Sequence, residues 1–180
     1  MPDSYTSKCA TAANGPAMSS VTITDFCDEN ARAFHDINAE WISAMFHLEA
    51  TDIAVLENPR ERIINTGGAI LFAEVAELGT VGACALQRTS EGCFELTKMG
   101  VRETARGFKV GEALLAAVIE RAKTMRATQL YLLTNQKCEA AIHLYEKLGF
   151  VHDSDILAAH GARYTRCDVA MTYRRLVPQT

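Results

Sequence analysis

The segment from Ala105 to Leu115, ARGFKVGEALL, combines a glycine-containing turn with the start of an apolar helical pattern. Backbone N–H groups in the first turn of a helix have no intrahelical acceptor, and the helix dipole adds partial positive charge there. Gly107 and Gly111 let the backbone approach a ligand closely. Arg106 and Lys109 add two cations to the same turn. This combination suits a pyrophosphate, although the turn by itself fits a plain helix cap equally well.

Two other phosphate-binding motifs do not fit this turn. A P-loop needs Lys and then Ser or Thr after its last glycine, but Glu112 follows Gly111. A dinucleotide-binding turn follows the first strand of its domain, whereas this turn follows four predicted strands. The sequence therefore disfavours a nucleotide-binding switch protein.

Composition narrows the class of protein further. The chain has 180 residues, of which 48% are apolar, enough for one domain with a sizeable core. A net charge of −4 argues against a nucleic-acid binder, and no apolar run reaches the roughly 18 residues of a membrane span. Residues 1–20 are small and polar without the features of a signal peptide, so we expect a disordered tail there and a single domain at 21–176.

The six cysteines form no C-x-x-C pair and no Cys/His cluster with zinc-finger spacing. We therefore expect no metal site, and reduced, mostly buried thiols in a cytoplasmic protein. Cys84 and Cys93 could face each other across a hairpin, but the pattern does not favour a disulfide between them.

The spacing of apolar residues predicts the elements that position the turn. Alternation and hairpin-length breaks predict strands at 21–26, from Ala69, from Thr80, from Cys93, at 129–134, at 150–156 and at 163–174. Helical spacing predicts helices over about 28–46, 49–56, 110–125 and 137–148, with Asp28 as an N-cap and Gly149 as a C-terminal glycine. A further helical piece is expected to begin near Pro59 and to stop at Gly67 and Gly68. The strand–helix–strand succession implies one parallel pair in an otherwise antiparallel sheet, and hence an α/β fold.

A second segment, AAIHLYEKLGF from Ala140 to Phe150, is more specific than the turn. It is similar almost letter for letter to the A-x-x-L-Y-x-K-x-G-F segment of GCN5-related N-acetyltransferases (GNAT). Residues 106–111 resemble that family's acetyl-CoA loop, Gln/Arg-x-x-Gly-x-Gly/Ala, with Lys109 in place of the first glycine. The resemblance covers roughly residues 21–175. It implies a GNAT fold, a mixed sheet of six to seven strands with an antiparallel N-terminal part, a splayed parallel central pair and about four flanking helices.

By this resemblance the chain is an acyltransferase that binds acetyl-CoA and transfers its acetyl group directly to a primary amine of a small molecule or peptide. The residues implied to bind the cofactor are Met99, Gly100, Val101, Arg106, Gly107, Phe108, Lys109, Val110, Gly111, Glu112, Asn135 and Cys138. Cys138 stands where the family often has an asparagine, and Asn135 could take that role. A route through an acyl-cysteine at Cys84 or Cys138 stays open.

Two residues are implied to move protons. Tyr145 resembles the family's general acid, which would protonate the leaving thiolate, and a packed core aromatic is the alternative interpretation. Glu95 is the candidate base for the amine, with a solvated carboxylate or proton loss to bulk water as alternatives. By strand alternation its side chain is expected on the same face as those of Thr97, Met99 and Val101.

The sequence indicates less specifically which residues would bind the acceptor amine. The family's first helices usually wall the acceptor pocket, and here they bring Trp41, Phe46, His47, Glu49 and Asp52, of which Trp41, Phe46 and Glu49 are the predicted substrate-binding residues. Alternation in the last predicted strand would put Tyr164, Arg166 and Asp168 on one face, either to bind a zwitterionic amine such as an amino acid or as a solvated sheet face. The net negative charge weakly favours a cationic acceptor.

Two questions of function and assembly stay open in the sequence. A non-catalytic acyl-CoA-binding or regulatory module on the same fold is the alternative to an enzyme. A homodimer is compatible with the family, while no nucleic acid or membrane partner is expected.

Overall fold

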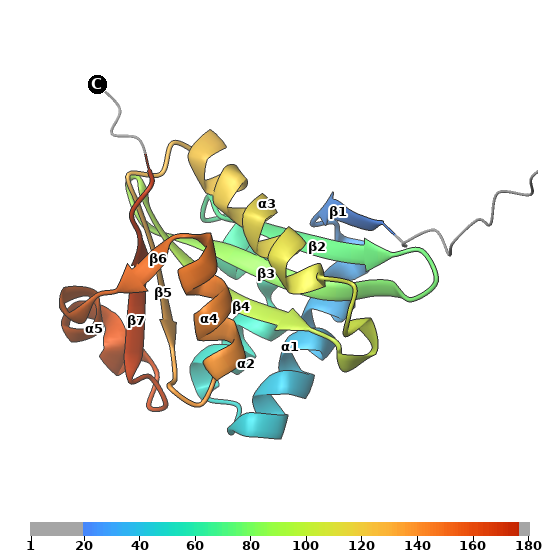
Figure 1. The fold of residues 1–180 in the computed structure, drawn as a ribbon, viewed down its shortest axis with the longest axis horizontal. Helices are drawn as coiled ribbons and strands as arrows, with labels where there is room; N and C mark the ends of the chain where they lie inside the picture. Colours follow the sequence, from blue (N-terminus) through green and yellow to red (C-terminus); the bar gives the residue numbers. More distant parts are fainter. Residues whose placement is uncertain (1–19, 177–180) are drawn as a thin grey trace, which may run out of the picture.

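The structure, a computed structural model, describes residues 20–176, so the predicted tail lies almost wholly outside the described residues. A seven-stranded mixed sheet with the order β1-β2-β3-β4-β5-β7-β6 runs through it (Figure 1). The strands are β1 (Val21–Asp25), β2 (Ala69–Val75), β3 (Gly79–Ser90), β4 (Cys93–Val101), β5 (Gln129–Thr134), β6 (Phe150–His152) and β7 (Val169–Tyr173). Every neighbouring pair is antiparallel except β4–β5, which confirms the predicted parallel pair.

Helices cover both faces of this sheet. They are α1 (Ala31–Met45), α2 (Ala50–Glu57), a π-helix (Arg60–Ile64), α3 (Val110–Thr124), α4 (Glu139–Leu148) and α5 (Ser154–His160). Short 3-10 turns lie at Asp28–Asn30, Glu103–Ala105 and Gly161–Arg163. The described residues thus hold six helices, where about four were expected.

Strand alternation divides the core into two layers. Leu71 of β2 points to the α3 side and packs with Leu114, whereas Phe72 points to the opposite side and packs with Phe34 of α1. These side chains are all buried. The sheet is therefore apolar on both faces, which explains why β2 and β3 read as nearly continuous apolar runs.

Several local predictions need correction. Asp28 does not cap the first helix, because a 3-10 turn intervenes and Asn30 takes the N-cap position of α1. The strand predicted at 150–156 stops at His152, since the Asp153 carboxylate accepts hydrogen bonds from the backbone N–H groups of Asp155 and Ile156 and starts α5. Gly149 does end α4, with a φ of 108°.

The last strand begins at Val169, not at residue 163. Its first residue pairs with Thr134, the end of β5, so the preceding segment has no strand beside it on that edge. Residues 164–168 therefore form a loop, and the expected alternation of Tyr164, Arg166 and Asp168 on one strand face is wrong. Cys84 and Cys93 are free thiols, and of the five described cysteines only Cys84 is buried, so the expectation of mostly buried thiols is wrong.

Candidate active site

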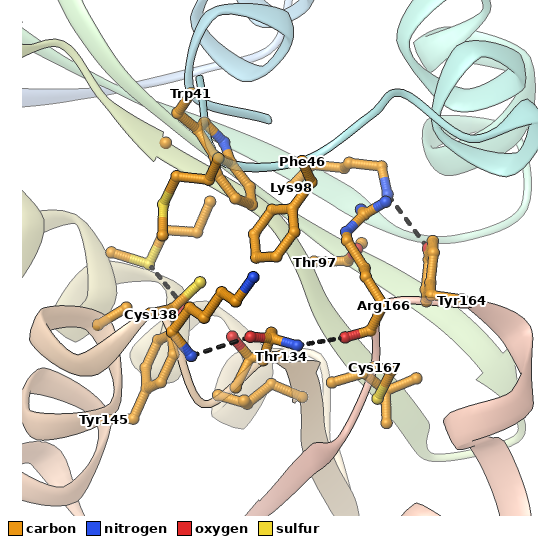
Figure 2. A pocket seen from close by; sticks show the side chains of 18 of the residues that line it. Trp41, Phe46, Thr97, Lys98, Thr134, Cys138, Tyr145, Tyr164, Arg166 and Cys167 are labelled. Atoms are coloured by element: carbon orange, nitrogen blue, oxygen red, sulfur yellow. Dashed lines mark hydrogen bonds between the residues drawn. The ribbon is translucent and has the colours of Figure 1, made fainter. Parts of the chain in front are cut away.

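A cavity of about 500 Å³ opens where β4 and β5 separate (Figure 2). The two strands pair only over Cys93–Leu96 and Gln129–Leu132, which is the expected splay. The walls of the cavity come from β4, the end of β5, the start of α4, the end of α1 and the 164–167 loop. Because β4 continues to Val101 without a β5 partner, its free edge can pair with a ligand.

A β-bulge in β4 decides which side chains face this cavity. Ala85 pairs with Thr97 and Ala83 with Gly100, so Lys98 and Met99 together oppose a single residue of β3. Lys98 adopts a φ of 51°, which is unusual for a residue with a side chain. The bulge shifts the alternation by one residue between the two halves of β4.

Glu95 consequently does not share a strand face with Met99 and Val101, contrary to the prediction. Met99 and Val101 pack with the α3-side core, while Glu95 is only 1% exposed and is ion-paired with Arg163 on the other side. The Tyr131 hydroxyl lies 3.5 Å from the Glu95 carboxylate. Burial raises the pKa of Glu95, against the opposing charges of Arg163 and Lys98. The carboxylate does not line the cavity.

The free edge of β4 presents backbone donors to the cavity. The N–H of Arg102 donates to Val81 on β3 at 2.8 Å. Since successive N–H groups of a strand point to opposite edges, those of Val101 and Met99 point toward the gap. Gly100 has a different role: a Cβ there would lie 2.6 Å from Trp41 Cδ1, so only glycine lets Trp41 pack against the strand.

Tyr145 lies in the cavity wall on the side away from Tyr164 and Arg166 (Figure 2). Its ring packs edge-on against Phe150 at 5.9 Å, and its hydroxyl lies 3.9 Å from Met99 Sδ. Burial raises the pKa of this phenol well above its ordinary value, with a smaller contribution from Cys84. The two interpretations of Tyr145 are therefore compatible, because a packed ring can carry its hydroxyl to the cavity wall, and the acid role stays a prediction.

The turn before α3 keeps the geometry of an anion-binding loop. Lys109, the N-cap of α3, adopts a left-handed φ of 55°, so it takes the conformation a glycine would provide. No side chain caps the helix, which leaves its first-turn N–H groups free. Around Gly107, with a φ of 92°, a Cβ would meet nothing within 4 Å. Arg106 is highly exposed beside Glu103. These features fit a phosphate group.

Other predicted cofactor residues have structural partners. Val110 and Phe108 pack in the α3-side core, and Glu112 pairs with Lys147 at 2.8 Å. A Cβ on Gly111 would lie 3.3 Å from Leu144, which brings the start of α3 against α4.

At the β5–α4 junction, Asn135 and Cys138 line the cavity. The amide of Asn135 is already engaged, donating to the Arg166 carbonyl at 2.7 Å and accepting from Lys137 N at 2.9 Å. Cys138 is the N-cap residue of α4.

A buried ionic network closes the end of the cavity that Arg166 and Tyr164 line. The Asp52 carboxylate, on α2, accepts from Lys98 Nζ at 2.9 Å and from both terminal nitrogens of Arg166 at 2.7 and 2.9 Å. Glu49 accepts from Arg166 Nη1 at 3.2 Å, and Lys98 Nζ donates to the Tyr164 hydroxyl at 3.1 Å. Sequence reasoning missed Lys98, although a lone lysine in an otherwise buried strand was the available signal.

The structure brings most of the predicted acceptor residues together. Trp41, Phe46, Tyr164 and Arg166 line the cavity, and Glu49 lies behind Arg166. Asp168 lies apart from them, where its carboxylate accepts from the backbone N–H of Gln136 at 2.8 Å. Within residues 20–176, no group of His, Cys, Asp and Glu could hold a metal ion, and no helix is long and apolar enough to cross a membrane.

Comparison with known proteins identifies the fold. A family model described as an acetyltransferase (GNAT) domain matches residues 66–152. A GNAT-family acetyltransferase from Staphylococcus aureus Mu50 superposes with a TM-score of 0.76 at 22% identity, covering 86% of this chain and 98% of that one. No protein of curated function matches the sequence significantly.

Two further structures of similar fold were solved with AcCoA or coenzyme A bound. A phosphinothricin acetyltransferase from Sinorhizobium meliloti, in complex with AcCoA, has a TM-score of 0.65 at 16% identity, covering 85% of this chain and 87% of that one. The PaiA N-acetyltransferase from Thermoplasma acidophilum, in complex with coenzyme A, has a TM-score of 0.63 at 16% identity, covering 86% and 99%. At such identities these likenesses show a shared fold.

Proposed function

Because the chain is a member of the GNAT acetyltransferase family, we propose that it is an acetyl-CoA-dependent N-acetyltransferase acting on a primary amine. One observation carries this proposal: the cavity lies where β4 and β5 separate and has Tyr145 in its wall. The structures of similar fold solved with AcCoA and CoA support the choice of cofactor. From the cysteine pattern we further propose a cytoplasmic location.

The cofactor would supply the acetyl group as an activated thioester. The free N–H groups at the start of α3, with Lys109 and Arg106 beside them, would hold its pyrophosphate. The unpaired edge of β4 would bind its amide-containing arm along the gap between the strands.

The chain's own groups then account for catalysis. The N–H groups of Met99 and Val101 would stabilise the charge that develops on the acetyl oxygen. The Tyr145 hydroxyl would give its proton to the departing thiolate and regain one from solvent. Glu95 is sealed behind Arg163, so the amine would lose its proton to water in the open cavity and not to this carboxylate.

Two experiments test cofactor binding and enzymatic activity separately. We expect acetyl-CoA and CoA, but neither ATP nor NAD, to raise the melting temperature, since a ligand at about 100 times its Kd adds roughly 2.7 kcal/mol. Thiol release with a panel of amines then tests turnover. Binding of acetyl-CoA without thiol release for any amine would favour the non-catalytic alternative.

Tyr145→Phe tests the acid role. We expect kcat to fall by about 10²- to 10⁴-fold with CoA affinity nearly unchanged, because only the hydroxyl is removed. Tyr173→Phe is the matched control, since Tyr173 is also buried and packs on Phe150 at 5.3 Å but does not line the cavity. Full turnover of Tyr145→Phe across the pH range would show the assignment to be wrong.

A further inference from the structure

The guanidinium of Arg166 has one edge without a protein partner. Of its five N–H donors, two on Nη1 go to Glu49 and Asp52, and one on Nη2 goes to Asp52. Among the described residues, nothing accepts from Nε or from the second N–H of Nη2. These two donors lie on the same edge of the guanidinium and form a fork that matches the two oxygens of a carboxylate.

This edge is fixed in place by its surroundings. The guanidinium carbon lies 5.8 Å from the ring centroid of Phe46 and 5.2 Å from that of Tyr164. The Arg166 side chain is 17% exposed, and the residue lines the cavity. The bidentate contact with Asp52 prevents rotation, so the free fork is oriented before any ligand binds.

The charges that line the cavity also favour an anionic group. Its described lining contains three cationic side chains, Lys98, Lys137 and Arg166, and a single carboxylate, that of Glu139. The counter-charges Asp52 and Glu49 lie behind Arg166, away from the lining. Figure 2 shows the side chains of Lys98 and Arg166 near each other on the Tyr164 side of the cavity, with Phe46 beside them. A second ammonium group on the acceptor would find no carboxylate at this end.

We propose that Arg166 binds a carboxylate of the acceptor, so that the acceptor is an amino acid or an amine of similar chemistry. This inference rests on the proposed N-acetyltransferase function, and it departs from the cationic acceptor that the net charge favours. The aromatic side chains of Trp41, Phe46 and Tyr164 supply apolar surface for an uncharged substituent. The carboxylate takes no part in the reaction. The amine nitrogen bonds to the acetyl carbon as the carbon–sulfur bond breaks, the amine proton goes to solvent, and the thiolate takes the Tyr145 proton.

Matched amines on the wild-type protein test the inference directly. Phenylalanine, leucine and tryptophan are each compared with their decarboxylated amine and their carboxamide, and spermidine serves as a polycation. We expect kcat/KM to be at least about tenfold higher for at least one amino acid than for both of its uncharged counterparts. Equal or faster reaction of the carboxamides, the decarboxylated amines or spermidine would overturn the carboxylate site and leave the proposed function standing.

A binding measurement separates the two proposals. In the presence of CoA, calorimetry compares the three N-acetyl amino acids with the N-acetyl derivatives of the decarboxylated amines. Tighter binding of the acids by about tenfold, without thiol release from any amine, would contradict the proposed function and retain the carboxylate site. The carboxylate site would be overturned if turnover shows no preference for the amino acids and, in addition, the N-acetyl amino acids either do not bind or bind no more tightly than the uncharged derivatives.

Arg166→Lys keeps the charge and removes the fork. We expect it to abolish the preference for the acid while binding of the uncharged derivative changes by less than about threefold. Arg60→Lys is the matched control, because Arg60 also pairs with an acid, Asp28, and lies over an aromatic ring, Phe26, but does not line the cavity. If Arg166→Lys does not fold, the wild-type comparisons decide the question. A retained preference in folded Arg166→Lys would overturn the assignment to Arg166.

Discussion

Replacing Asp52 with Asn should destabilise the protein strongly, because this carboxylate is fully buried between two cations. Burial by itself would raise the pKa of Asp52, but the hydrogen bonds from Arg166 and the charge of Lys98 hold it at about 2, against an ordinary value of 3.8. At 1.36 kcal/mol per pKa unit this difference corresponds to about 2 kcal/mol of stability. Asn also leaves the Lys98 ammonium, itself 5% exposed, without its charge partner.

We therefore expect Asp52→Asn to lower the free energy of unfolding by about 3–5 kcal/mol at pH 7. The pH dependence has a defined sign. A carboxylate with a lowered pKa stabilises the fold above its unfolded pKa, and this contribution is lost as the pH falls from about 3.8 toward 2. The wild type should lose this stability over that range, whereas Asp52→Asn has no such group to titrate.

Urea denaturation at pH 7 and at a series of lower pH values measures both effects. Asp28→Asn is the matched control, since Asp28 also pairs with an arginine but its side chain is 70% exposed. We expect the control to change the free energy of unfolding by less than about 1 kcal/mol. A loss below about 1 kcal/mol for Asp52→Asn, or one equal to that of the control, would refute this account of the buried network.

Three further substitutions test other parts of the site. Lys109→Gly should change the free energy of unfolding by less than about 1 kcal/mol, because relief of the left-handed φ is offset by a more flexible unfolded chain. The same substitution should weaken acetyl-CoA binding severalfold in calorimetry. An unchanged Kd would show that the Lys109 ammonium does not contact phosphate. Gly100→Ala should cost about 1–3 kcal/mol and shift the fluorescence of Trp41, the single tryptophan, and an unshifted spectrum would contradict their contact. Burial raises the pKa of Glu95, so its ionisation makes the wild type less stable as the pH rises through that pKa. In urea titrations, Glu95→Gln should remove this pH-dependent loss of stability, and it should keep kcat within about threefold of the wild type. A hundredfold fall in kcat would instead support Glu95 as the general base.

Local patterns predicted most of the elements because their causes are local. The run QLYLLT gives β5 with the predicted bounds, and Gly149 ends α4 in the left-handed conformation that a C-terminal glycine provides. The strand predictions failed for one local and one non-local reason. Asp153 caps a helix within the predicted strand at 150–156, whereas residues 164–168 form a loop because β5, their neighbour in the sheet, ends at Thr134.

For this protein the sequence by itself determined the family resemblance, the succession of the seven strands and the two segments, 105–115 and 140–150, on which the proposed cofactor site depends. Short-range periodicity and turn chemistry specify these features. Only the tertiary structure decided which side chains face the cavity. The bulge at Lys98 depends on how β4 pairs with β3, and it turns Glu95 away from the side of Met99. The free edge of Arg166 exists because Asp52, 114 residues away in sequence, occupies another edge of the same guanidinium.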